Sequence, residues 1–213
     1  MAKVLCVMGE SGSGKTTSMR NLDPATTYYI DADKKGLSWR GWKTQYNAEH
    51  KNYFKTDVAE TILKILQGIN IGRPQIKTVV IDTINGIMVA DEMRRIKEKN
   101  YDKWTDLAVS IYGLCDYALT MRDDMAVIFI AHTQTDREDS GYMFTHIKTS
   151  GKKLDKITVE SKFPTVLLAK TIEGRHVFET KANNSTAKLP MGAIEEDVID
   201  NDITIVLKAL EDF

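Results

Sequence analysis

Residues 4–20 read VLCVMGESGSGKTTSMR, a short apolar run followed at once by glycines, serines and a lysine. Residues 9–16 match the phosphate-binding pattern G-x-x-x-x-G-K-[ST] at every fixed position. The apolar run predicts a buried strand, and residues 17–22 predict the start of a helix. In this context the N–H groups of the loop converge on a phosphate at the positive end of the helix. The stretch therefore predicts binding of a nucleoside triphosphate, with a plain flexible turn as the alternative.

The positions of this loop have distinct expected roles. The side chain of Lys15 should reach the β- and γ-phosphates, and the hydroxyl of Thr16 should hold Mg²⁺. The glycines permit backbone conformations that other residues rarely adopt. The expected nucleotide-binding residues are Gly9, Glu10, Ser11, Gly12, Ser13, Gly14, Lys15, Thr16 and Thr17.

The composition is that of an ordinary folded domain. The 213 residues fit one large domain, and 42% hydrophobic with 28% charged residues exclude a disordered chain. The formal net charge of −1 means that any nucleic-acid contact must come from a local patch. Two isolated cysteines predict neither a disulfide framework nor a zinc site. No apolar run has membrane-spanning length and the start is not that of a signal peptide, so we expect a cytoplasmic protein without membrane contact.

Four strand-like runs alternate with helical patterns along the first two thirds of the chain. The runs are KVLCVM (3–8), TTYYIDA (26–32), KTVVIDT (77–83) and MAVIFIAH (125–132). Strands that alternate with helices, and that are nearly continuous in apolar residues, predict a buried parallel sheet. The predicted fold class is an α/β P-loop NTPase fold, with a mostly parallel central sheet, helices on both faces and a C-terminal β-hairpin.

The whole chain, residues 1–213, is predicted to be a single domain with three parts. The core covers residues 1–135. Residues 136–162 include the one long stretch without a clear period and predict a loop, and long loops in compact domains are usually functional or mobile. Residues 163–213 predict a hairpin that turns at Glu173–Gly174, followed by a final helix.

Carboxylates follow two of the predicted strands. TVVID ends at Asp82 and matches the Walker B pattern, in which a carboxylate at a strand tip beside the P-loop holds Mg²⁺, usually through water. YYIDAD ends the second strand with Asp31 and Asp33. We expect Asp33 to be the general base that positions the attacking water, with Glu10 as an alternative. Both strand-end aspartates could instead simply be solvated.

The fourth strand ends in AHTQ, at the sheet edge where ligands of open α/β sheets bind. His132 and Gln134 are therefore candidates for a sensor that detects the γ-phosphate and passes its presence to the following loop. A strand-end histidine with purely structural hydrogen bonds is the alternative.

Together these motifs resemble the RecA-like ATPase core. IDAD stands where that family has an acid after its second strand, VVIDT fits its Walker B strand, and AHTQ stands where its fourth strand ends in a polar sensor. More closely, the chain resembles the compact phage-encoded ATPases of recombination and single-strand annealing, the Sak-four group. The stretch ETKANNSTAKLPMGAIEEDVIDNDI (179–203) is similar to the end of those chains. The family acid is usually Glu, so the shorter Asp33 implies hydrolysis that is slow or depends on DNA.

This resemblance implies an ATPase that uses ATP and Mg²⁺ and acts on DNA, expected to be single-stranded, in phage recombination or replication. A phage single-strand-binding protein is a further expected partner, and the host cytoplasm is the expected location. RecA-like proteins carry trans-acting lysines in a comparable region, so Lys181 and Lys188 are expected to complete the ATP site of a neighbouring subunit in a ring or filament. An exposed turn whose lysines serve only solubility is the alternative.

The long loop is the expected DNA contact. Lys148, Lys152 and Lys153 supply positive charge, and Tyr142 and Phe144 are available for base stacking. Acidic residues nearby dilute this charge, so a merely solvated loop is the alternative.

Other P-loop functions fit the sequence less well. A GTPase needs glycine three residues after Asp82, where Asn85 stands, and the N-K-x-D base-reading motif is absent. The L-S-G-G-Q signature of transporter-type ATPases is absent too. Two alternatives stay open: a nucleoside or nucleotide kinase on the same scaffold, and a non-catalytic nucleotide switch that docks a partner.

Overall fold

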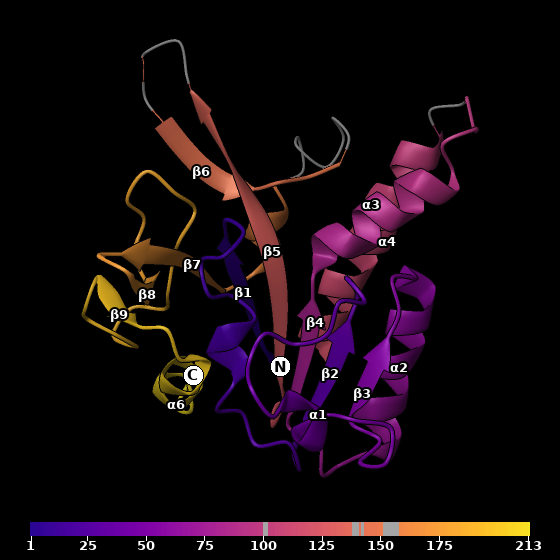
Figure 1. Ribbon diagram of the computed structural model, residues 1–213, viewed down its shortest axis with the longest axis horizontal. Coiled ribbons are helices and arrows are strands. Elements are labelled where there is room, and N and C mark those ends of the chain that lie inside the picture. Colours follow the sequence, from indigo (N-terminus) through magenta and orange to yellow (C-terminus); the bar gives the residue numbers. More distant parts are fainter. Residues whose placement is uncertain (100–101, 138–140, 142, 151–157) are drawn as a thin grey trace.

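A nine-stranded sheet organises the computed structural model, which describes residues 1–99, 102–137, 141, 143–150 and 158–213. The strands are β1 (Lys3–Gly9), β2 (Thr27–Asp31), β3 (Tyr53–Lys55), β4 (Thr78–Asp82), β5 (Ala126–Arg137), β6 (Met143–Ile147), β7 (Thr165–Ile172), β8 (Arg175–Glu179) and β9 (Val198–Asp200). The helical elements are η1 (Thr17–Met19), α1 (Trp42–Gln45), α2 (Ala59–Gly72), α3 (Ile84–Arg94), α4 (Asp102–Thr120), η2 (Val159–Lys162) and α6 (Ile203–Ala209). Figure 1 shows α2, α3 and α4 together at one side of the molecule and α6 at the other.

The sheet is mostly parallel. The strand order is β3-β2-β4-β5-β1-β7-β8-β9, and β6 pairs with β5 outside this path. All neighbours from β3 to β7 in this order run parallel. The β7–β8, β8–β9 and β5–β6 pairs are antiparallel. The predicted α/β P-loop fold class is confirmed, and the hairpin of β7 and β8 turns at Glu173–Gly174 as the sequence predicts.

Strand β5 lies between the P-loop strand β1 and the strand β4 that ends at Asp82. The registers pair Gly9 with His132 and Asp82 with Ile130. Strand β5 thus separates the P-loop strand from the strand that ends at Asp82. The insertion brings His132 next to the start of the P-loop.

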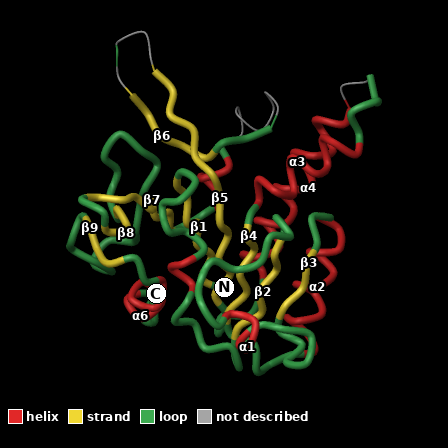
Figure 2. The backbone as a smooth tube through the Cα atoms, in the orientation of Figure 1, coloured by secondary structure: helices red, strands yellow, loops and turns green. Residues whose placement is uncertain are grey.

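Alternate residues of each strand pack on opposite faces of the sheet. On one face, Cys6 and Phe129 belong to a core that includes apolar residues of α2, α3 and α4. On the other face, Val7 and Ile128 pack with residues of η1, of α6 and of the segment 37–46. Figure 2 shows the long helices gathered at one side, with loops over much of the rest. Within the described part of the chain, no helix is long and apolar enough to cross a membrane.

The helix expected over residues 17–22 is only the short 3₁₀ turn η1. A residue that precedes proline disfavours the helical conformation, and Asp23 precedes Pro24. The Asp23 carboxylate also accepts a hydrogen bond from the N–H of Ala25 over 2.9 Å, which stabilises a turn instead. The N–H groups available to a phosphate are therefore those of the loop, without a long helix behind them.

The segment 136–162, expected as an irregular loop, contains regular structure. Strand β5 continues to Arg137, and β6 returns antiparallel to it, pairing Thr133 with Ile147. The alternation in MFTHI is too weak to predict a strand, and pairing with β5 supplies what the sequence pattern lacks. Figure 1 shows the β5–β6 hairpin projecting beyond the rest of the sheet.

Candidate nucleotide-binding site

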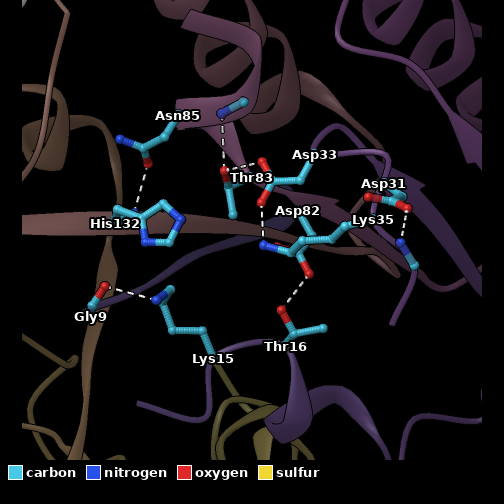
Figure 3. Close-up of polar contacts among 12 residues, drawn as sticks. Gly9, Lys15, Thr16, Asp31, Asp33, Lys35, Asp82, Thr83, Asn85 and His132 are labelled. Atoms are coloured by element: carbon cyan, nitrogen blue, oxygen red, sulfur yellow. Dashed lines mark hydrogen bonds and ion pairs between the residues drawn. The ribbon is translucent and has the colours of Figure 1, made fainter. Parts of the chain in front are cut away.

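The P-loop turns the side chain of Lys15 back toward its own backbone. The ammonium group donates hydrogen bonds to the carbonyl oxygen of Gly9 over 2.8 Å (Figure 3) and to that of Glu10 over 2.6 Å. Only 6% of Lys15 is exposed, and burial lowers its pKa to about 8. Because a buried cation is costly unless an anion compensates it, the loop favours binding of a negatively charged group.

Thr16 and Asp82 meet at the carboxyl edge of the sheet. The Thr16 hydroxyl donates to Asp82 Oδ2 over 2.7 Å (Figure 3), and the Tyr29 hydroxyl donates to the same oxygen over 2.8 Å. Burial raises the pKa of Asp82. Its other carboxylate oxygen, Oδ1, is buried and has no hydrogen-bond partner among the described residues.

This pair fits a Mg²⁺ ion. Magnesium takes oxygen ligands, commonly one or two carboxylates together with waters and substrate phosphates. A buried carboxylate oxygen without a partner is costly, and a cation or its bound water would satisfy Asp82 Oδ1. The two residues that the sequence predicts as metal ligands, Thr16 and Asp82, are thus brought together.

Asp33 is held in place by the chain that follows β4. The Thr83 hydroxyl donates to Asp33 Oδ1 over 2.9 Å, and the N–H of Gly86 donates to the Thr83 hydroxyl over 3.0 Å. A Cβ atom at Gly86 would clash with Asp33 Oδ1, so only glycine allows this approach. Although burial opposes ionisation, hydrogen bonds from Lys35 and Thr83 lower the pKa of Asp33. The carboxylate is therefore ionised and oriented.

His132 connects the site with the chain beyond β5. Burial lowers the pKa of His132, and the charge of Lys15 acts in the same direction, so the ring is neutral at pH 7. The backbone N–H of His132 donates to Asn85 Oδ1 over 2.7 Å, and its carbonyl accepts from the N–H of Lys148 over 2.8 Å. Asn85 Nδ2 donates to the carbonyl of Lys148 over 2.7 Å. One buried amide thereby ties the start of α3 to both β5 and the segment that follows β6.

A cavity of about 190 Å³ lies between the P-loop and these strand ends. Its P-loop lining consists of Ser11, Gly12, Gly14, Lys15, Thr16 and Thr17. Glu10 and Ser13 line an adjacent hollow of about 350 Å³ toward the β5–β6 hairpin. His132 lines the smaller cavity, whereas Asp33 touches it only through its partners Thr83 and Lys35.

Four residues of this cavity are not among the site residues predicted from the sequence: Lys35, Ser38, Thr83 and His176. Lys35 and Ser38 belong to the loop after β2, and the Ser38 hydroxyl lies 2.9 Å from that of Thr17. Lys35 could have been found from the sequence, because IDADKK places two lysines directly after the strand-end aspartates. Nothing in the sequence pattern pointed to His176, because its place beside the P-loop depends on the pairing of β8 with β7 and of β7 with β1.

The second sensor candidate, Gln134, lies outside the smaller cavity. Its amide nitrogen contacts Asp136 Oδ2 over 3.2 Å and His146 Nε2 over 3.3 Å within the β5–β6 hairpin. Of the two sensor candidates, His132 alone lines the cavity. A role for Gln134 at the phosphate stays a prediction.

Of the lysines expected to bind DNA or a neighbouring subunit, the three that the structure describes do not line the cavity. Lys148 is exposed just past β6, and Lys152 and Lys153 lie outside the described residues. Lys181 is held in an ion pair at 2.7 Å with an acidic neighbour, and Lys188 is exposed. Neither lines the cavity of its own P-loop, so their predicted catalytic role requires a second subunit.

A family comparison covers most of the chain. The sequence model of the family described as AAA domain matches residues 1–188. The chain belongs to the AAA domain family. The match includes the P-loop, Asp33, Asp82 and His132, and no curated protein matches the chain.

An AAA domain indicates a nucleotide-binding ATPase. The P-loop, the Thr16–Asp82 pair and the cavity beside them agree with that assignment for this AAA domain. The finer resemblance to the phage annealing ATPases stays a prediction.

Proposed function

We propose that this AAA domain protein is a Mg²⁺-dependent ATPase that acts on single-stranded DNA in phage recombination or replication. The observation that supports it most strongly is the contact of Thr16 with Asp82, whose buried Oδ1 has no partner among the described residues. A phosphate-binding loop, a buried lysine and a pair of metal ligands thus occupy one edge of the sheet.

The site residues have separate proposed roles in phosphoryl transfer. The loop N–H groups and Lys15 would bind the phosphates, while Thr16 and Asp82 would hold Mg²⁺. Bound Mg²⁺ supplies positive charge that offsets the charge developing on the transferred group. His132, whose neutral ring lines the same cavity, would contact the terminal phosphate. Asp33 accepts a hydrogen bond from the attacking water and orients it, since its lowered pKa makes it a weak base.

The β5–β6 hairpin is the proposed DNA contact. On this hairpin, the rings of Phe144 and His146 stack on each other, with their centroids 6.2 Å apart and an angle of 21° between their planes. Aromatic rings on a projecting hairpin offer a stacking surface for bases, which is how many proteins bind single strands. Lys148 is exposed at the base of the hairpin and, with Lys152 and Lys153, supplies charge for the DNA phosphates.

Assembly is the other part of the proposal. In a ring or filament, Lys181 and Lys188 of one subunit complete the ATP site of the next. Both line a groove at the C-terminal segment together with Met191, which is 97% exposed and offers apolar contact area. A phage single-strand-binding protein is the further proposed partner.

The rate of phosphate release from ATP, with and without single-stranded DNA, tests this function. We expect turnover without any acceptor nucleoside and a higher rate when DNA is present. Replacing Lys148, Lys152 and Lys153 by alanine should weaken DNA binding and flatten its salt dependence. Phosphate transfer only to an added nucleoside would establish the kinase alternative, and tight ATP binding without turnover would establish the switch.

A further inference from the structure

A second lysine enters the nucleotide cavity from the loop that follows β2. Lys35 lines this cavity together with Lys15, Thr16 and His132. Its ammonium group lies 2.5 Å from Asp33 Oδ2, and Figure 3 shows it pointing toward Asp33 and His132. The Lys35 side chain is 55% exposed, so it can change partners without disturbing the core.

The turn that carries Lys35 is firmly held. The N–H of Gly36 donates to Asp31 Oδ2 over 2.8 Å, and the Tyr53 hydroxyl donates to the same oxygen over 2.6 Å. Gly36 has a φ of +84°, and a Cβ at this position would lie 2.8 Å from the ring of Trp42. Asp31 is buried and thus fixes the path of the backbone on which Lys35 stands. The backbone position of Lys35 is therefore set by a hydrogen-bonded turn.

The preceding lysine takes a different direction. Lys34 pairs with Asp57 at 2.7 Å, and it does not line the nucleotide cavity. Its side chain is 49% exposed, close to the value for Lys35. Of these two adjacent lysines of similar exposure, Lys35 alone lines the phosphate-binding cavity.

The positive charge of Lys35 affects the pKa values of two groups that line the cavity. Burial is the main cause that lowers the pKa of Lys15 and of His132, and the positive charge of Lys35 adds to the decrease in both. Cations gathered in one cavity repel each other, and an anion among them relieves this repulsion. The terminal phosphate of a nucleotide held by the P-loop is such an anion.

We propose that Lys35 is a second phosphate-binding cation, supplied by the same chain, which exchanges Asp33 for the terminal phosphate of bound ATP. This inference rests on the proposed function. In the ion pair, Lys35 occupies one oxygen of Asp33 and Thr83 occupies the other. When the Lys35 side chain moves from Asp33 to the phosphate, Asp33 Oδ2 is free to accept a hydrogen bond from the attacking water. ADP lacks that phosphate and leaves the ion pair closed.

Calorimetric titration with a non-hydrolysable ATP analogue and with ADP, each with Mg²⁺, tests the exchange. Lys35→Gln should weaken binding of the analogue about ten- to hundredfold, as for loss of one charge-assisted hydrogen bond, and binding of ADP by less than about twofold. Lys34→Gln is the matched control and should change neither affinity. Lys35→Arg keeps the charge and should retain the preference for the analogue.

A second variant tests the competition with Asp33. Asp33→Asn removes the rival partner of Lys35, so affinity for the analogue should rise, and the rise should vanish in the Asp33→Asn/Lys35→Gln double variant. Equal losses for the analogue and ADP in Lys35→Gln, or no loss, overturn this inference and leave the proposed function standing. Failure of the wild-type chain to bind any nucleotide overturns both.

Discussion

The hydroxyl of Thr16 lies 2.7 Å from Asp82 Oδ2, although Thr16 follows β1, Asp82 ends β4, and β5 lies between these strands. Only the folded sheet brings the two residues together. Asp82 Oδ1 beside this contact is buried without a partner in the described residues. A carboxylate oxygen in that condition, next to a phosphate-binding loop, is suited to a hydrated divalent cation.

Replacing Asp33 by asparagine should lower the rate of ATP hydrolysis about a hundredfold or more, as for loss of a group that orients the attacking water. Binding of ATP should not weaken, because Asp33 does not itself line the phosphate cavity. Single-turnover hydrolysis and an ATP titration measure the two effects. Asp57→Asn is the control, since it removes a nearby carboxylate outside the site. Weakened binding at an unchanged rate would make Asp33 a structural residue.

Asn85→Ala should reduce the stimulation of ATP hydrolysis by single-stranded DNA while affinity for ATP is retained. The Asn85 amide joins the N–H of His132 to the carbonyl of Lys148, beside the direct backbone bond between these two residues, so its loss weakens the link between the nucleotide site and the proposed DNA-binding segment. Asn85→Asp is the sharper variant, because it keeps the acceptor for His132 and removes the donor to Lys148. ATPase rates across a DNA titration measure the effect. Full stimulation in both variants would show that the amide carries no coupling.

We expect the carboxylate of Asp202 to make a pH-dependent contribution to the free energy of unfolding. Its carboxylate accepts hydrogen bonds from Asn21 Nδ2 over 2.6 Å and from the N–H of Thr204 over 3.0 Å. Although burial opposes ionisation, these bonds lower the pKa of Asp202 below its ordinary value of 3.8. Because the folded state binds this proton less readily than the unfolded state, the stabilisation is complete above the ordinary pKa and is lost as pH falls through the folded value.

Asp202→Ala should therefore lower the free energy of unfolding by about 1 kcal/mol at pH 7, the usual cost of losing a helix N-cap. The difference from wild type should shrink as the pH falls below about 4. Chemical denaturation of both proteins across this range measures it, with Asp202→Asn as a control that keeps a capping group. A difference that does not vary with pH would contradict the assignment.

Mixing of inactive subunits tests the proposed assembly. Lys15→Ala subunits lack a working P-loop, and Lys181→Ala/Lys188→Ala subunits lack the proposed trans-acting lysines. A mixed interface joins an intact P-loop to intact lysines, so the mixture should recover part of the ATPase activity. Native mass measurement verifies that the complexes are mixed. No recovery in such complexes would leave Lys181 and Lys188 without a catalytic role.

The sequence predicted the parts of the site that depend on local pattern. The P-loop has fixed spacing, and Asp33 and Asp82 follow strands whose apolar runs are unmistakable. Parallel strands place their carboxyl ends at one edge, so these residues had to approach each other. The AAA domain match over residues 1–188 agrees with the predicted P-loop fold.

Features that depend on distant pairing were not predictable in the same way. The strand order places β5 between β1 and β4, a property of the sheet and not of any one strand. Strand β6 owes its conformation to β5, since MFTHI lacks a strong pattern. The direction of Lys35 depends on the turn at Gly36, which the buried carboxylate of Asp31 holds through a hydrogen bond.

The most direct test of the nucleotide site is calorimetric titration of ATP with and without Mg²⁺ in wild type, Lys15→Ala and Asp82→Asn. We predict that wild type binds ATP more tightly with Mg²⁺, and that Lys15→Ala loses affinity about tenfold or more, because it lacks a charge-assisted contact with the phosphates. Asp82→Asn should bind ATP with little gain from Mg²⁺. Equal affinities in wild type and Lys15→Ala, or no ATP binding by the wild-type chain, would contradict the account.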